Sequence, residues 1–174
     1  MKTFTKLTLS LTVACAAALS VVSQAFADAP PLPDSGTYFI VNASSEQALQ
    51  PVQASAGQSV YLQSFSKSGI QKWTLTRKID PATKKPTNRY NIRLAGENTT
   101  LQFQPHPVAD SPAIVSTDKS TMVIESGESG CLIKSVSQNG DALCILQAPP
   151  SDTETRFSPD DGSAKFRWTF VSAQ

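Results

Sequence analysis

"IQKWTLT" occupies residues 70–76 and "AKFRWTF" occupies residues 164–170, and these two stretches hold both tryptophans of the 174-residue chain. Each tryptophan is followed by threonine and an apolar residue, the alternation that is typical of a half-buried β-strand. The tryptophans lie about 95 residues apart. Since this spacing leaves room for a third copy of the unit between them, the sequence predicts an internal repeat.

Short strands account for the rest of the chain. Runs of alternating polar and apolar residues are bounded by Gly, Asn, Ser, Asp and Pro, and helical periodicity is nearly absent. The runs form three sets of four strands: 37–42, 47–52, 59–65 and 72–78; 89–95, 99–105, 112–117 and 121–126; 131–137, 142–147, 153–158 and 167–173. Repeats of about 42 to 52 residues are typical of a unit that cannot bury its apolar face alone.

The three sets also share a register. Each has an inward residue followed eleven positions later by a leucine: Tyr38 and Leu49, Tyr90 and Leu101, Leu132 and Leu143. Trp73, Met122 and Trp168 take the fourth-strand position. The phase of the third copy stays open, because Cys131 could replace Leu132 as the inward residue.

Three four-stranded units that each end on a large apolar residue resemble the ricin-B-type β-trefoil. The resemblance covers Gly36 to about Ser172, and Gln71-Lys72-Trp73 matches the Q-x-W motif of that family. The third repeat has Phe166-Arg167-Trp168 and the second has Thr121-Met122, so both depart from the motif. The resemblance implies an all-β β-trefoil of twelve strands with pseudo-threefold symmetry.

The expected trefoil is one domain over residues 36–174, with repeats at about 36–78, 88–126 and 129–173. Six strands would close a small barrel and six would form hairpins that cap one end, which removes exposed strand edges. The expected inward residues are Tyr38, Ile40, Leu49, Val60, Leu62, Trp73, Leu75, Tyr90, Ile92, Leu101, Ile114, Val123, Leu143, Phe166, Trp168 and Phe170.

The N-terminus has the features of an export signal. Lys2 and Lys6 precede an apolar stretch over residues 7–22, and Ala25-Phe26-Ala27 is a cleavage signal. We therefore expect a cleaved signal peptide at 1–27 and a secreted or periplasmic protein, with a lipid anchor at Cys15 as the less favoured alternative. Residues 28–35, "DAPPLPDS", are expected to form an extended proline-rich tether.

The amino-acid composition limits the classes of binding partner that can be expected. Cleavage after Ala27 would leave 147 residues with 13 basic and 14 acidic side chains, and no basic stripe is present, so a nucleic-acid partner is not expected. After residue 27 the sequence contains no run of about 18 apolar residues, so it predicts no membrane-spanning helix there. We expect a monomer.

Two cysteines follow the signal peptide, Cys131 and Cys144. An even pair in an exported protein favours a disulfide. However, a tight turn at Asn139-Gly140 would set Cys144 opposite Ser135, four positions from Cys131. A disulfide and two buried thiols therefore both stay open.

The resemblance implies carbohydrate binding through an aromatic ring and polar side chains beside the second and third strands of a repeat. In the first repeat Gln53 stands where the family has Asp, and Gln63 stands at the aromatic position, with Tyr61 two residues away. The second repeat offers Gln104, His106 and Asp110 without an aromatic residue. The third offers Asp152, Glu154, Arg156 and Phe157. Gln53, Tyr61 and Gln63 are thus candidates for a degenerate sugar site.

A peptidase inhibitor is the alternative. Residues 78–89, "KIDPATKKPTNR", form a loop with two prolines, and Lys84 and Lys85 suit the acidic pocket of a trypsin-like protease. A rigid loop loses less entropy on binding. The expected partner is accordingly a glycan or an extracellular protease.

Catalysis is not expected. His106 is the single histidine, so the sequence offers neither a histidine-based metal cluster nor a Ser-His-Asp set with spare members. We expect no cofactor and no metal.

Overall fold

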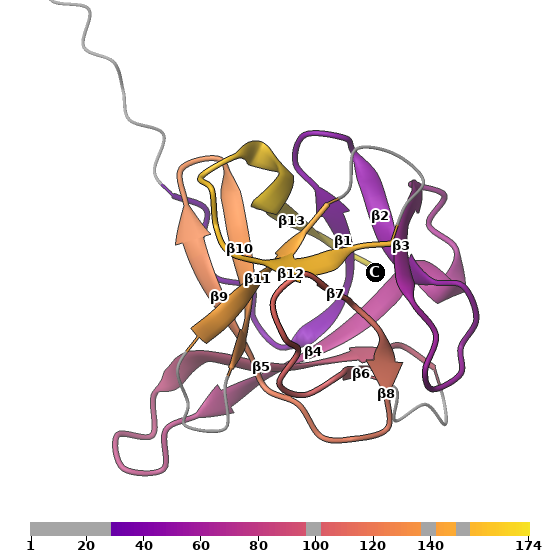
Figure 1. Cartoon of the computed structure of the whole chain (residues 1–174). Helices are drawn as coiled ribbons and strands as arrows, with labels where there is room; N and C mark the ends of the chain where they lie inside the picture. Colours follow the sequence, from indigo (N-terminus) through magenta and orange to yellow (C-terminus); the bar gives the residue numbers. More distant parts are fainter. Residues whose placement is uncertain (1–28, 97–101, 137–141, 149–153) are drawn as a thin grey trace, which may run out of the picture.

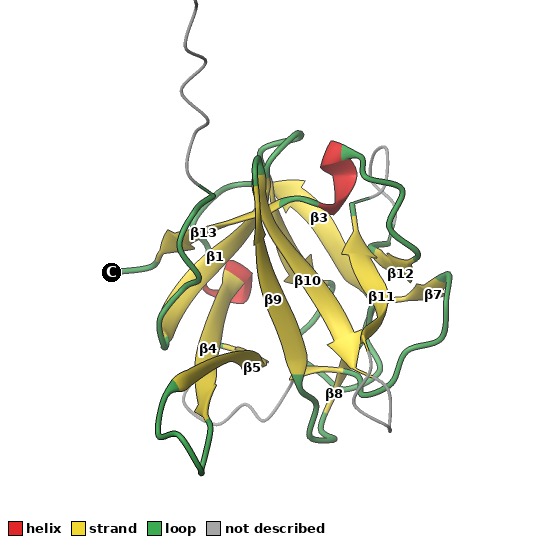
Figure 2. Ribbon diagram, turned by 90° about the vertical axis from the view of Figure 1, so that its left-hand side faces the viewer, coloured by secondary structure: helices red, strands yellow, loops and turns green. Residues whose placement is uncertain are grey.

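The structure is a computed structural model and describes residues 29–96, 102–136, 142–148 and 154–174 (Figure 1). Of residues 142–145 and 147 only the backbone is described. These residues form an all-β fold in which the two helical segments are short 3-10 turns (Figure 2). The turns are η1 (Gly69–Gln71) and η2 (Ala164–Phe166). None of the described helices has the length and apolar character that a membrane span requires.

Six strands close a barrel. They are β1 (Gly36–Asn42), β4 (Lys72–Ile79), β5 (Pro86–Leu94), β9 (Met122–Gly127), β10 (Gly130–Val136) and β13 (Trp168–Ser172). Each pairs antiparallel with the next, and β13 pairs with both β10 and β1. Closure leaves the barrel without an exposed edge, as the sequence predicted.

The remaining strands form three hairpins. β2 (Gln47–Pro51) pairs with β3 (Val60–Ser64), β6 (Gln102–Phe103) with β8 (Val115–Ser116), and β11 (Ala142–Gln147) with β12 (Arg156–Ser158). The described part contains a thirteenth strand, β7 (Ser111–Pro112), which pairs with β12. The predicted strand 112–117 is thus divided, because its first part pairs with the third repeat and its second part with β6.

A ring of three backbone hydrogen bonds marks the pseudo-threefold axis. The amide of Val60 donates to the carbonyl of Ala113, Ala113 donates to Thr155, and Thr155 donates back to Val60, each at 2.8 Å. One residue at or just before the third strand of each repeat therefore occupies the same place around the axis. The predicted β-trefoil is confirmed.

Strand register settles the phase of the third repeat. Tyr38 pairs with Trp73, Tyr90 with Met122 and Cys131 with Trp168. Cys131 is 3% exposed and belongs to the core cluster, whereas Leu132 is half-buried. Cys131 is therefore the inward residue, and the choice of Leu132 was wrong.

The same register shows that two of the second-strand core residues are not the predicted ones. The equivalents of Leu49 in the core are Phe103 and Leu146, since these face Val115 and Phe157 as Leu49 faces Leu62. The eleven-residue spacing fails because the two equivalent core positions lie 11 residues apart in the first repeat (38 and 49), 13 in the second (90 and 103) and 15 in the third (131 and 146). Leu101 lies outside the described residues, as does the side chain of Leu143.

Most of the other predicted inward residues are buried: Ile40, Leu49, Val60, Leu62, Trp73, Leu75, Tyr90, Ile92, Phe166 and Trp168. Tyr38 and Phe170 are half-buried and pack against the core. Their two rings meet edge-to-face, with centroids 6.2 Å apart. Ile114 is only half-buried, and Val123 is buried outside the main cluster. Their neighbours Val115, Met122 and Ile124 point into the core instead, because adjacent strand residues face opposite sides.

Candidate functional site

The first repeat carries a surface hollow of about 360 Å³ at the place where the sequence predicted a sugar site. It is lined by Gln50 and Pro51 at the end of β2, by Val52 directly after it, and by Tyr61 and Gln63 from β3. β2 and β3 pair with Gln50 opposite Tyr61, which brings the aromatic ring and one amide side by side. Two of the three predicted residues, Tyr61 and Gln63, thus lie together. Gln53 is exposed in the loop that follows and does not line the hollow.

The hydroxyl of Tyr61 is held by a residue of the third repeat. Tyr61 Oη and Ser59 Oγ both donate to Glu154 Oε1, at 3.1 Å and 2.8 Å. Burial, followed by the bond to Glu154, raises the pKa of Tyr61. The hydrogen bond to Glu154 fixes the ring beside the hollow.

Arg156 extends this network, and its Nη2 lies 3.9 Å from Glu154 Oε2. The sequence placed Glu154 and Arg156 in a separate third-repeat site. The backbone bond from Thr155 to Val60 instead brings this segment against β3 of the first repeat. The role of Glu154 toward Tyr61 has no signal in the sequence, since 93 residues separate them.

Gln71 of the Q-x-W motif orients Gln50. Its side chain is 1% exposed, and its Nε2 donates to Ser64 O at 2.9 Å and to Gln50 Oε1 at 3.0 Å. Its Oε1 accepts from the amide of Ser66 at 3.0 Å. The side-chain oxygen of Gln50 accepts this bond from Gln71. Among the described residues the NH₂ group of Gln50 has no hydrogen-bond partner, so it is left for a ligand. Gln71 is thus structural and also sets the direction of a donor in the hollow.

The other two repeats lack this arrangement among the described residues. By the register of the third strands, Ile114 and Arg156 occupy the position of Tyr61. Neither supplies an aromatic face. Of the second-repeat candidates, His106 is exposed and its Nδ1 lies 2.7 Å from Val136 O, and Asp110 Oδ1 accepts from Ser158 Oγ. Asp152 lies outside the described residues.

The predicted inhibitory loop is shorter than expected. β4 ends at Ile79 and β5 begins at Pro86, because strand pairing continues from Arg77–Tyr90 to Ile79–Pro86. The connecting residues 80–85 form a tight turn in which Asp80 Oδ1 accepts from the amides of Ala82 and Thr83. Lys84 and Lys85 are exposed at this turn, and Lys84 has a left-handed φ of 57°. Lys84 is therefore not part of an extended segment.

Cys131 is a buried free thiol. Lys134 of β10 pairs with Ile145 of β11, which sets Cys144 beside Ser135, four residues along β10 from Cys131. Of the two alternatives that the sequence left open, the free thiol of Cys131 favours two unbonded cysteines; the side chain of Cys144 lies outside the described residues.

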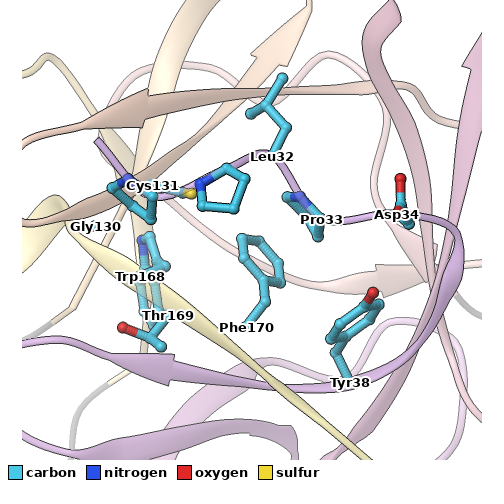
Figure 3. Close-up of a pocket in the computed structure, with 11 residues that line it drawn as sticks. Leu32, Pro33, Asp34, Tyr38, Gly130, Cys131, Trp168, Thr169 and Phe170 are labelled. Carbon is cyan, nitrogen blue, oxygen red and sulfur yellow. The ribbon is translucent and has the colours of Figure 1, made fainter. Parts of the chain in front are cut away.

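A second hollow of about 400 Å³ lies where the N-terminal segment crosses the barrel end (Figure 3). Leu32 packs against the core, Pro33 is buried, and Tyr90 Oη donates to Pro33 O at 2.8 Å. Residues 30–34 form one wall, and side chains such as Trp168 and Phe170 form the other. The walls are largely apolar and offer few groups to a sugar hydroxyl.

Comparisons with known proteins place the fold. No family model matches the sequence, and no curated protein matches it. Several solved structures match its fold. The Rhizoctonia solani agglutinin superposes with a TM-score of 0.65 at 19% identity, covering 83% of this chain and 99% of its own. The Macrolepiota procera ricin B-like lectin, solved with lactose, gives 0.63 at 14% identity over 82% and 99%. The designed threefold-symmetric protein ThreeFoil gives 0.62 at 18% identity over 79% and 99%. The chain thus has the β-trefoil fold of ricin B-like lectins.

Proposed function

We propose that this protein is a non-catalytic, exported carbohydrate-binding protein whose sugar site is the Tyr61 hollow, lined by Gln50, Pro51, Val52, Tyr61 and Gln63. The fold supports this, because two of the similar structures are lectins and one of them was solved with lactose. The observation that carries the proposal is the fixed Tyr61 ring, which lines one hollow together with Gln50 and Gln63. A sugar would stack its C–H face on the ring while the amides bond its hydroxyls.

The site is degenerate in a specific sense. The carboxylate nearest to the ring, Glu154, accepts bonds from Tyr61 and Ser59. It therefore orients the ring, and the amides are left to make the polar contacts with the sugar. Neutral amides bond hydroxyls more weakly than a charged carboxylate does, so we expect modest affinity.

The test is a glycan array followed by calorimetric titration of the best glycan. Tyr61→Ala should lower its affinity about tenfold or more, because the stacking face is lost. Gln53→Ala is the matched control, since Gln53 lies in the adjacent loop but outside the hollow. A Lys84→Gln/Lys85→Gln variant assayed against trypsin examines the inhibitor alternative. An array without binding, or equal affinities of the wild type and Tyr61→Ala, would exclude the proposed site.

A further inference from the structure

A third hollow, of about 390 Å³, lies at the side of the barrel in the second repeat. We call it the Gln102 hollow, and its lining residues are Thr76, Asn91, Arg93, Gln102, Thr117 and Lys119. They come from β4, β5, β6 and the segment after β8. All six are polar and none is acidic. The volume is within the range of small-molecule sites.

The pseudo-threefold symmetry identifies the equivalent place in the first repeat. Val41 pairs with Ala48 in the first repeat as Arg93 pairs with Gln102 in the second. In the first repeat the place is filled by an apolar cluster, in which Phe39, Val41 and Ala48 are buried and Phe65 packs against them. The rings of Phe39 and Phe65 lie 5.1 Å apart. The second repeat therefore replaces a small apolar core with a polar hollow.

Burial of Gln102 in this position is energetically unfavourable. It is 4% exposed, and its Oε1 has no hydrogen-bond partner in the described structure. Buried amide oxygens are nearly always paired, because an unpaired one has lost its hydration without compensation. The oxygen has almost no solvent-accessible surface in this structure, so a ligand with a hydrogen-bond donor would satisfy it after a rotation of the Gln102 side chain toward the hollow.

Two cations flank the hollow. Arg93 and Lys119 are exposed, and neither forms an ion pair with a described residue. The equivalent of Arg93 in the third repeat, Lys134, is instead paired with Glu125. Uncompensated cations at the rim of a hollow without carboxylates favour an anionic ligand.

We propose that the Gln102 hollow binds a sugar carboxylate, the chemistry of a uronic acid. The carboxylate meets Arg93 and Lys119, and a ring hydroxyl donates to Gln102 Oε1. The inference extends the proposed carbohydrate binding to acidic sugars. It uses none of the residues of the Tyr61 hollow, so either site can fail without the other.

The experiment is calorimetric titration of the full chain with sodium glucuronate, methyl glucoside and sodium sulfate. Methyl glucoside lacks the carboxylate and sulfate lacks the donor. Glucuronate should bind about tenfold or more tightly than either. Equal binding of methyl glucoside, sulfate binding as tight as that of glucuronate, or no glucuronate binding would each overturn the proposal.

Variants locate the site. Arg93→Gln and Lys119→Gln should each weaken glucuronate binding about fivefold to tenfold and reduce its salt dependence. Lys67→Gln removes the same charge in the first repeat and should leave the affinity for glucuronate unchanged. Gln102→Leu should abolish the preference for glucuronate over sulfate. Because Arg93 and Lys119 are exposed, their variants test the site even if Gln102→Leu folds poorly; unchanged affinity in both would overturn the proposal.

Discussion

The indole Nε1 of Trp73 donates a hydrogen bond to the carbonyl oxygen of Leu49 at 3.0 Å. Trp168 makes the same bond to Leu146, the equivalent residue of the third repeat, also at 3.0 Å. The second repeat has Met122 and Phe103 at these two places, and Phe103 stacks parallel on Trp73 with ring centroids 5.1 Å apart. The repeated tryptophan therefore binds the second strand of its own repeat to the barrel.

Replacing either tryptophan by phenylalanine should cost similar stability. The buried carbonyl of Leu49 or Leu146 loses its donor, so Trp73→Phe and Trp168→Phe should each lower the free energy of unfolding by about 1–3 kcal/mol. The alanine variants should lose about 3–5 kcal/mol. Urea denaturation measures both, with Met122→Leu as a control that should cost less than about 1.5 kcal/mol. An unchanged midpoint for Trp73→Phe would show that the bond contributes nothing.

Two buried glutamines should respond in opposite directions to the same substitution. Gln102→Leu removes an amide whose oxygen is unpaired and should raise the free energy of unfolding without ligand by about 1 kcal/mol. Gln71→Leu removes an amide with satisfied donors and acceptor and should lower it by about 1–3 kcal/mol. The two variants are compared in one urea series. A loss of stability in Gln102→Leu would mean that its amide is paired in solution.

Asn42 joins the first and third repeats. It is fully buried, its Nδ2 donates to Lys165 O and Arg167 O, and its Oδ1 accepts from the amides of Ser44 and Ser45. Asn42→Asp keeps the acceptor but loses both donors, and we expect a loss of about 2–3 kcal/mol by thermal or chemical denaturation. Ser44→Ala removes one surface contact and should cost less than about 1 kcal/mol. Equal losses in the two variants would contradict this role.

The thiol of Cys131 should be unreactive in the folded protein. Burial raises its pKa, and the thiolate is the species that reacts. In a chain with Cys15 and Cys144 replaced by serine, labelling with a thiol reagent should be slow in buffer and fast in denaturant. Raising the pH to 9 should accelerate labelling of the folded protein far less than that of the unfolded chain. Rapid labelling in buffer would place Cys131 at the surface.

Acid should remove the contribution of the Asp161 carboxylate to the stability of the fold. The side chains of Lys165 and Ser163 hold the pKa of this carboxyl well below its usual range. A depressed folded-state pKa stabilises the protein above the unfolded value of about 4, and this stabilisation is lost as the pH falls toward the folded value. The difference in melting temperature between wild type and Asp161→Asn should therefore shrink below about pH 4. A difference that stays constant down to pH 2 would rule out the shift.

The strands, their grouping into three repeats and most of the core were predictable, because period-2 alternation and the two tryptophans are local signals. The inward position of Cys131 and the core positions of Phe103 and Leu146 were not, because the connections between strands differ in length and pairing fixes the register.

The sequence alone determined that this chain forms short strands in three repeats, since alternation of polar and apolar residues suits only a half-buried sheet. Tertiary structure decided which residues share a surface. Glu154 comes to Tyr61 only through the backbone ring of Val60, Ala113 and Thr155. Likewise, the buried Oε1 of Gln102 lacks a hydrogen-bond partner among the described residues, at the place where the first repeat has an apolar cluster. Burial and hydrogen-bond satisfaction depend on packing between distant segments, and no local pattern contains them.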